Sequence, residues 1–326
     1  MALLEVDNLA VDIPLSDGVL HAVSGVSFSL ERGETLAIVG ESGSGKSMTS
    51  LALMNLLPKR AVRRADRLLF DGIDLVTAPE ARMRALRGNR MAMIFQEPMT
   101  SLNPSYTIGN QLGEALRCHR PVAPAAARDR AVQLLEKVGI PAAARRLNQY
   151  PHQLSGGLRQ RVMIAMALMC GPDLIIADEP TTALDVTIQA QILHLLADLK
   201  KEFGMAMILI SHDLGVVARV ADKVAVMYAG RVVESAGAQS LFRSPRHPYT
   251  RGLLNCIPVP GRTAPGSPLG AIPGQLPNLI GPQHGCAFRE RCAFAAPECA
   301  GDIPLVVTEP GHLARCVRID ALEAAA

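Results

Sequence analysis

The sequence contains no tryptophan, and the three aromatic residue types together make up only 3% of its 326 residues. Proteins that bind single-stranded nucleic acid by stacking its bases need aromatic side chains, and this chain has few of them. The charge is also nearly balanced, with 33 Lys and Arg against 30 Asp and Glu and a net charge of +3. Nucleic-acid-binding domains are usually strongly basic, so both shortages argue against a nucleic acid as partner.

The chain also lacks a long apolar run. No stretch approaches the roughly 20 residues that cross a bilayer as a helix. The first twenty residues mix acidic and apolar side chains, without the basic start and apolar run of a secretory signal. Apolar residues nevertheless make up 49% of the chain, which is ample for a buried core. We expect a folded protein that works in the cytoplasm.

Short apolar runs alternate with helical patterns along most of the chain. Runs of strand length lie at 35–39, 174–177 and 205–210, and helical patterns lie at 47–57, 97–160 and 188–203. Continuous apolar strands are typical of a parallel sheet that is covered by helices on both faces. Residues 3–13 and 23–30 alternate between apolar and polar side chains, which predicts two further strands. The fold class is therefore α/β.

A glycine-rich string follows the run at 35–39 and leads into a helical pattern. It reads Gly40, Glu41, Ser42, Gly43, Ser44, Gly45, Lys46, Ser47 and Met48. The string matches the phosphate-binding loop G-x-x-x-x-G-K-[ST] in its required context between strand and helix. Backbone N–H groups of such a loop cradle phosphates, Lys46 reaches the β- and γ-phosphates, and the Ser47 hydroxyl binds Mg²⁺. We predict that Gly40 to Met48 bind ATP.

Two carboxylates follow the apolar run at 174–177. Asp178 and Glu179 stand at its carboxyl end, where ligands collect in an open α/β sheet. Asp178 is a candidate to hold Mg²⁺. Glu179 is a candidate base that polarises the attacking water.

The string Leu154-Ser155-Gly156-Gly157 resembles the signature motif of the ATP-binding cassette (ABC) ATPases. Other motifs of that family follow in its order: Gln96 resembles the Q-loop glutamine, Asp185 in Ala183-Leu184-Asp185 resembles the D-loop, and His212 resembles the switch histidine. The resemblance implies an ABC nucleotide-binding domain of the P-loop NTPase class. It has a RecA-like core, an antiparallel β subdomain and a helical signature subdomain, here at about 97–160.

The resemblance also implies a role for each matching residue. Glu179, His212 and Gln96 would act in catalysis, and Ser47, Gln96 and Asp178 would hold Mg²⁺. Ser155, Gly156 and Gly157 would bind the γ-phosphate of the ATP on a second subunit, and Asp185 would organise the contact between the two subunits. Two features depart from the family pattern: Leu158 replaces the usual glutamine, and no aromatic residue is placed to stack on adenine. His21 and Ile13 are the candidates for that adenine contact.

Three further strings are similar to the branch of oligopeptide and dipeptide importers, which includes nickel and glutathione importers. They are Phe95–Pro104, Tyr150–Gln153 and Ser244–Thr250. The resemblance implies an ATPase subunit that energises peptide import from the cytoplasmic face of the inner (plasma) membrane. Its implied partners are a second homologous ATPase or a second copy, two transmembrane permease subunits and an extracytoplasmic peptide-binding protein. Import of nickel or glutathione is an alternative. An ABC ATPase of DNA maintenance is a weaker one, because no sustained heptads appear.

The composition changes near residue 256. Seven prolines and six glycines fall within 256–285, which predicts an irregular linker. We therefore divide the chain into an ATP-binding domain, 1–255, and an irregular C-terminal extension, 256–326, with four cysteines: Cys286, Cys292, Cys299 and Cys316. Their spacing lacks the C-x2–4-C pairs of most zinc sites. An iron–sulfur cluster, zinc and four free thiols all remain open, and the resemblance implies a [4Fe–4S] cluster that staples the extension.

Overall fold

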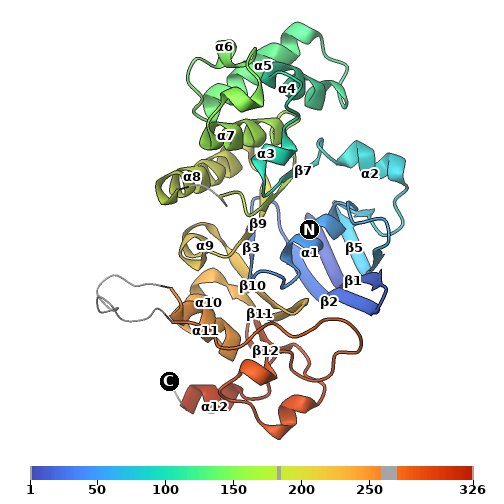
Figure 1. The fold of residues 1–326 in the computed structure, drawn as a ribbon, viewed down its shortest axis with the longest axis vertical. Coiled ribbons are helices and arrows are strands. Elements are labelled where there is room, and N and C mark those ends of the chain that lie inside the picture. The colour runs from blue at the N-terminus through green and yellow to red at the C-terminus, as the bar shows by residue number, and fades with distance from the viewer. Residues whose placement is uncertain (1, 182–184, 258–269, 325–326) are drawn as a thin grey trace. The chain divides into compact units, whose positions relative to one another are not determined.

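The computed structural model describes residues 2–181, 185–257 and 270–324 (Figure 1). The chain forms two compact units, which are described separately below. The first unit consists of Met1–Leu30, Thr35–Val76 and Ser211–Ala326, and the second consists of Glu31–Glu34 and Thr77–Ile210. The phosphate loop and the C-terminal extension therefore lie in the same unit. The division of the sequence at residue 256 stays a prediction.

An antiparallel sheet forms one part of the first unit. Its strands are β1 (Leu4–Leu15), β2 (Gly18–Leu30), β4 (Val62–Arg64), β5 (Arg67–Phe70) and β6 (Ile73–Asp74). They lie in the order β2-β1-β5-β6, and β4 also pairs with β1. The alternation predicted β1 and β2 but made both too short, because the two strands continue into their hairpin, where Leu15 pairs with Gly18.

A second sheet of the first unit combines parallel and antiparallel pairs. Its strands are β3 (Thr35–Val39), β10 (Lys223–Tyr228), β11 (Arg231–Gly237), β12 (Val306–Glu309) and β13 (His312–Ala314). The pair β3 and β10 is parallel, whereas β10–β11, β11–β13 and β13–β12 are antiparallel. Every residue of β3 is buried, as its apolar run predicts. A buried aliphatic side chain contributes about 1.5–3 kcal/mol, so such strands hold the core together.

Helices of the first unit flank these strands. They are α1 (Lys46–Leu53), α9 (Leu214–Val220), α10 (Ala238–Arg243) and α11 (Pro248–Asn255). Leu214, Leu241 and Tyr249 from three of them share one core cluster with β3 and β10. The prediction of a helix as far as residue 57 was wrong by four residues. The chain leaves the helix because Asn55 has a left-handed backbone, with φ at 51°.

The second unit contains three parallel strands and a group of helices. Its strands are β7 (Met91–Ile94), β8 (Leu174–Asp178) and β9 (Ala206–Ser211), paired in that order. Its helices are α2 (Glu80–Leu86), α3 (Pro98–Ser101), α4 (Ile108–Arg117), α5 (Pro124–Lys137), α6 (Ala143–Arg146), η1 (Pro151–Gln153), α7 (Gly156–Ala167) and α8 (Val186–Phe203). All residues of β8 and β9 are buried, as expected of strands covered on both faces. Helices α4, α5 and α7 pack together (Figure 1).

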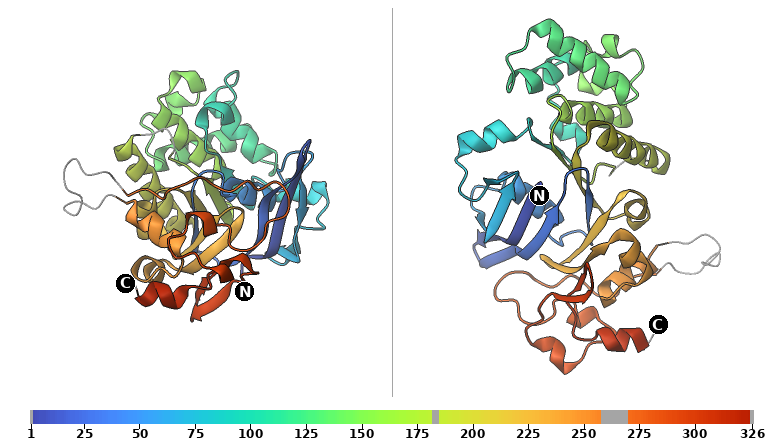
Figure 2. Two further views of the ribbon diagram at one scale, coloured as in Figure 1. Left: turned by 60° about the horizontal axis from the view of Figure 1, so that its bottom comes forward. Right: turned by 180° about the vertical axis from the view of Figure 1, so that it is seen from behind.

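The C-terminal extension is more regular than its composition predicts. Beyond residue 288 it forms η2 (Arg289–Arg291), η3 (Pro297–Ala300), β12, β13 and α12 (Ile319–Ala324). The prediction of an irregular extension was wrong for this part, because β13 pairs with β11 and joins the sheet of the core. Residues 270–288 do lack helices and strands. This segment runs along β2, where Ile280 bridges to Leu20 (Figure 2).

Candidate ATP site and cysteine cavity

The phosphate loop follows β3 and turns into α1 within the first unit. Gly40 has φ at +150°, and a Cβ atom at this position would lie 2.2 Å from the carbonyl oxygen of Met227. Only glycine fits here, because any side chain would collide with the backbone of β10. The glycine at the start of the string thus lets the loop lie directly against the neighbouring strand.

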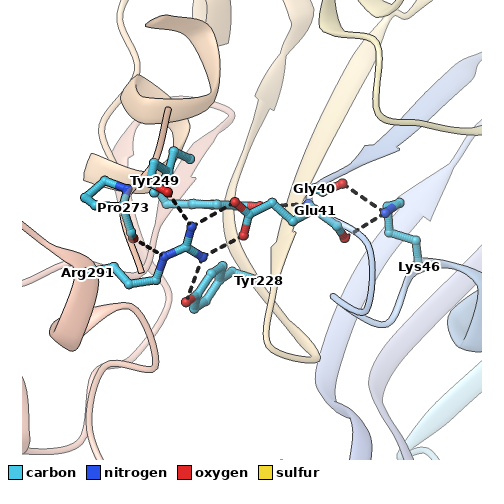
Figure 3. A network of polar contacts seen from close by, with 8 residues as sticks. Gly40, Glu41, Lys46, Tyr228, Tyr249, Pro273 and Arg291 are labelled. Carbon is cyan, nitrogen blue, oxygen red and sulfur yellow. Dashed lines mark hydrogen bonds and ion pairs between the residues drawn. The ribbon is translucent and has the colours of Figure 1, made fainter. Parts of the chain in front are cut away.

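Lys46 is 4% exposed, and its ammonium points back over the loop (Figure 3). Its Nζ donates hydrogen bonds of 2.9 Å to the carbonyl oxygens of Gly40 and Glu41. The buried hydroxyl of Ser44 has no hydrogen-bond partner within the described residues. No side chain caps the N-terminus of α1, so its first N–H groups face the loop. A cation, uncapped N–H groups and an orphan hydroxyl together suit a bound phosphate.

Three predicted site residues come together in the second unit. Asp178 ends β8 and is 5% exposed, and Glu179 follows it. The Nε2 of Gln96, two residues beyond β7, donates a hydrogen bond of 3.2 Å to Oε2 of Glu179. Glu179 has a left-handed backbone, with φ at 45°, and its N–H donates to the carbonyl of Ile210 at 3.0 Å. Such strain in a residue other than glycine is typical of functional sites.

The signature residues lie at the N-terminus of α7. Ser155 is the N-cap, and its Oγ accepts a hydrogen bond of 3.4 Å from the N–H of Leu158. Ser155 and Gly156 are exposed. The N-terminus of a helix of this length attracts anions, so the exposed signature can receive a phosphate from another molecule. The substitution of Leu158 for the usual glutamine leaves this backbone arrangement in place.

Two other predicted residues stand at helix starts. Asp185 is the exposed N-cap of α8, where its Oδ1 accepts from the N–H of Ile188 at 3.0 Å. Ala183 and Leu184, which complete the D-loop string, lie outside the described residues. His212 is exposed just beyond β9, ahead of α9, and belongs to the first unit with the phosphate loop. The predicted site residues are thus shared between the two units.

The candidate contacts to adenine lie on β1 and β2. The Nδ1 of His21 lies 2.7 Å from the Oδ1 of Asp12, and Arg64 binds the other carboxylate oxygen of Asp12. This pairing fixes the His21 ring against its own sheet, which makes stacking on a base less favourable. Ile13 is half-buried. The residue that contacts adenine stays a prediction.

The four cysteines of the extension line one small cavity of about 10 Å³, beside His247 and Phe288. The N–H of Cys286 donates to the carbonyl of Cys299 at 2.9 Å. Burial raises the pKa of Cys316 to about 11, and the three other thiols add to this rise. Burial also raises the pKa of Cys286 and Cys292, so burial favours the neutral thiol at all three positions.

The described residues contain no group of three or more His, Cys, Asp or Glu that could already hold a metal ion. A cavity of about 10 Å³ has room for roughly one water molecule. The thiols would therefore have to move apart before a cluster of several atoms could enter. The donor set itself, four cysteines that line one cavity, is of the kind that holds a thiolate-bound metal centre.

Two long-range contacts between polar side chains were not predicted from the sequence. Glu234 on β11 is fully buried, accepts from the N–H groups of Arg246 and His247, and lies 2.7 Å from the Nε2 of His312. The second contact joins Arg291 of the extension to Glu41 of the phosphate loop. A single sequence carries no signal for either pair, because the partners lie far apart along the chain.

Comparison with known proteins gives two family matches. A model described as "ABC transporter" matches residues 23–182, and one described as "Oligopeptide/dipeptide transporter, C-terminal region" matches residues 233–299. The oligopeptide transport ATP-binding protein OppD of Salmonella typhimurium is 50% identical over 97% of this chain and 93% of its own length. The dipeptide transport ATP-binding protein DppD of Bacillus subtilis is 50% identical, with 96% and 93% covered.

The fold also matches solved structures. The dimeric, post-hydrolysis structure of the ATP-binding cassette MJ0796 with ADP and Pi has a TM-score of 0.64 and 26% identity. The match covers 72% of this chain and 98% of that one. CbiO1 of Clostridium perfringens, part of the ABC transporter complex cbiONQ, has a TM-score of 0.62 and 28% identity, with 74% of this chain covered. The α/β fold class and its P-loop NTPase type are confirmed.

Proposed function

This chain belongs to the ATP-binding subunits of oligopeptide and dipeptide ABC transporters. We propose a role in ATP hydrolysis for each of the site residues named above. The chain hydrolyses ATP to ADP and phosphate and couples this reaction to peptide import through membrane permease subunits. Dipeptides and oligopeptides are the proposed cargo, ahead of nickel and glutathione. The relatives named for peptide transport support this choice.

The phosphate loop holds the nucleotide. Lys46 gives up its bonds to the two loop carbonyls and neutralises the β- and γ-phosphate oxygens. The uncapped N-terminus of α1 adds N–H donors to the same phosphates. The hydroxyl of Ser47, the amide of Gln96 and the carboxylate of Asp178 offer the oxygen ligands that Mg²⁺ prefers. When bound, Mg²⁺ neutralises charge on the β- and γ-phosphates.

Glu179 is the proposed base. The observation that carries this role is the contact between Gln96 and Glu179 at the ends of adjacent parallel strands, beside the buried Asp178. The amide orients the Glu179 carboxylate, which can then accept a proton from the attacking water. His212 donates a hydrogen bond to the γ-phosphate and keeps the water in line with the bond that breaks.

A second ATPase subunit completes each site. Ser155, Gly156 and Gly157 lie at a helix N-terminus where Ser155 and Gly156 are exposed, so they can bind the γ-phosphate of ATP held by the partner. Asp185 organises the contact between the two subunits. We propose a homologous second subunit ahead of a homodimer, with two permease subunits and an extracytoplasmic peptide-binding protein. None of the helices in residues 2–181, 185–257 and 270–324 combines the length and apolarity that a bilayer crossing needs. The proposed location is peripheral, on the cytoplasmic face of the membrane.

The substitution Glu179→Gln tests this assignment. It removes the base but keeps the shape of the side chain, so hydrolysis by the assembled transporter should fall by roughly a hundred- to ten-thousandfold. Nucleotide binding should persist, and an ATP-bound dimer should accumulate in size-exclusion chromatography. Glu97→Gln, an exposed neighbour of the Q-loop glutamine, is the matched control. Normal steady-state hydrolysis by Glu179→Gln would remove Glu179 from its role.

The cysteine cavity is proposed as the site of a [4Fe–4S] cluster, with Zn²⁺ as the alternative. The support is the convergence of four thiols on one cavity, together with spacings that lack the short pairs of most zinc sites. A cluster would cross-link segments of the extension that contain few helices or strands. Its proposed role is structural.

Metal analysis of the purified chain tests this second assignment. Four irons and four acid-labile sulfides per chain would support the cluster, whereas one zinc would support the alternative. The substitution Cys292→Ser should remove the metal and increase proteolysis of the extension. Cys118→Ser, at an exposed cysteine outside the cavity, should leave the metal content unchanged. An unchanged metal content and a protease-resistant extension in Cys292→Ser would contradict the assignment.

A further inference from the structure

The phosphate loop contains a carboxylate whose charge opposes its ligand. Glu41 is the second residue of the loop, and its side chain is 28% exposed. ATP brings several negative charges into the same loop, and like charges at short range repel strongly where water is partly excluded. The carboxylate must be neutralised or turned away if the loop is to bind phosphates tightly.

Arg291 provides this neutralisation from the C-terminal extension (Figure 3). Its Nη1 lies 2.6 Å from Oε2 of Glu41, and its Nη2 lies 2.9 Å from Oε1. This is the paired geometry in which a guanidinium binds a carboxylate most strongly. The Arg291 side chain is only 5% exposed, so solvent and salt screen the pair weakly.

The rest of the extension and core fixes the guanidinium in place. Its Nε donates to the carbonyl of Pro273 at 2.7 Å, and its Nη2 also donates to the carbonyl of Ile272 at 3.1 Å. Its Nη1 also donates to the hydroxyl of Tyr228 at 3.3 Å. All five N–H donors of the side chain therefore have an acceptor. The contacts with Glu41 and Tyr228 raise the pKa of Arg291 above its usual value, so the side chain stays charged.

Three aromatic rings pack around the contact between Arg291 and Glu41. Tyr228, Tyr249 and Phe288 lie with ring centroids 4.7 to 5.3 Å apart. Arg291 lies 5.7 Å from the ring centre of Tyr228 and 5.8 Å from that of Phe288. The backbone N–H of Glu41 donates to the hydroxyl of Tyr249 at 2.8 Å, and its carbonyl accepts from Lys46. Glu41 is therefore held by its N–H, its carbonyl and its carboxylate at once.

We propose that Arg291 is a positioning residue for ATP, through which the C-terminal extension completes the phosphate loop. It neutralises and fixes Glu41, so that the loop presents its N–H groups and Lys46 to the phosphates without an opposing charge. Loss of order around Cys292, the next residue, would then weaken nucleotide binding through Arg291. This inference rests on the proposed nucleotide site and adds a residue that lies far outside the ATP motifs.

A double-mutant cycle on the full chain tests the proposal. The dissociation constant of Mg²⁺ and a fluorescent ATP analogue is measured for wild type, Arg291→Gln, Glu41→Gln and the double variant. Arg291→Gln should weaken binding at least about tenfold, because it leaves a partly buried carboxylate without its cation. In the Glu41→Gln background the same change should alter the constant by less than about threefold, because no charge remains to be neutralised.

Three further variants separate the explanations. Arg291→Lys keeps the charge and should restore most of the affinity. Arg289→Gln, at an exposed arginine on the same short helix, should bind as wild type does. An equal loss in both Glu41 backgrounds would show that Arg291 only holds the extension together and would overturn the proposal, as would no loss at all. Lys46→Ala serves as the test of the site itself: if it binds ATP normally, the proposed function fails, whatever Arg291 does.

Discussion

The phosphate loop and the cysteine-lined extension are organised in opposite ways. Lys46 of the loop bonds to Gly40 and Glu41, which lie six and five positions away in the sequence, respectively. The extension depends on distant partners: Arg291 and Glu41 lie 250 positions apart, and His312 and Glu234 lie 78 apart. The loop can therefore be recognised as a string of residues. The contacts that hold the extension cannot be recognised in this way, because each joins residues far apart in the sequence.

The largest expected effect is a loss of ATP hydrolysis when the phosphate loop, which is held by local contacts, is changed. Lys46→Ala removes the cation that faces the phosphates, so hydrolysis by the assembled transporter should fall by roughly a hundred- to a thousandfold. Phosphate release with saturating Mg²⁺ and ATP measures this effect. Lys59→Ala, at an exposed lysine, is the control and should keep its rate. A rate within about tenfold of wild type in Lys46→Ala would show that the loop does not depend on its lysine.

The second largest effect is a loss of stability when a long-range contact of the extension is removed. His312→Ala leaves the fully buried Glu234 with two backbone donors but without its side-chain partner. Removing one partner of a buried polar contact costs up to about 3 kcal/mol of the free energy of unfolding. Urea unfolding of the purified chain measures the loss, and the exposed His284→Ala is the control. Equal stability of the two variants would mean that this contact does not hold β13 to the core.

A smaller effect is expected where two parts of the extension approach each other. Gly285 has φ at +70°, and a Cβ there would lie 2.6 Å from the carbonyl oxygen of Cys299. Gly285→Ala should therefore lower the free energy of unfolding by about 2 kcal/mol. Gly33→Ala is the matched control, because Gly33 has φ at +73° but no atom within 4 Å of the added Cβ. That variant should lose only about 1 kcal/mol.

Reactivity of the cysteines gives a second measurement for the same pair of variants. Gly285→Ala should expose the cavity thiols and speed their labelling in metal-free protein, whereas Gly33→Ala should not. Equal losses of stability in the two variants would show that backbone conformation alone, and not the close approach to Cys299, sets the cost.

The smallest effect is expected for a pair of residues that is distant in the sequence but exposed. It tests whether burial or sequence distance determines the contribution of a pair to stability. Lys137 and Glu202 also pair across many positions, but their side chains are 39% and 51% exposed. Exposed pairs contribute little, so Lys137→Ala should change the free energy of unfolding by less than about 0.5 kcal/mol. A loss as large as that of His312→Ala would show that long-range pairing stabilises this protein regardless of burial.

The predictability of each region follows from the same contrast. Strand β3 and the loop after it were placed correctly, because a buried strand and a glycine-rich turn are local patterns. Helix α1 was predicted too long, since the left-handed backbone of Asn55 is not visible in periodicity. The strands of the extension were missed because β13 is stabilised by pairing with β11, not by its own three residues.

The candidate site divides in the same way. Its residues could be named from motifs, and the structure joins two of them, Gln96 and Glu179, by a hydrogen bond. Arg291 could not be named, because nothing in the sequence indicates which arginine will face Glu41. The roles of the named residues stay predictions until the variants are measured.

The cluster of Tyr228, Tyr249 and Phe288 gives this molecule a built-in optical reporter. The chain has four tyrosines and no tryptophan, and the other two tyrosines, Tyr106 and Tyr150, are exposed. Near-ultraviolet circular dichroism will therefore come chiefly from this cluster, in which Tyr228 contacts Arg291 and Tyr249 accepts a hydrogen bond from the N–H of Glu41. Nucleotide binding and loosening of the extension can each be followed spectroscopically, without any added label.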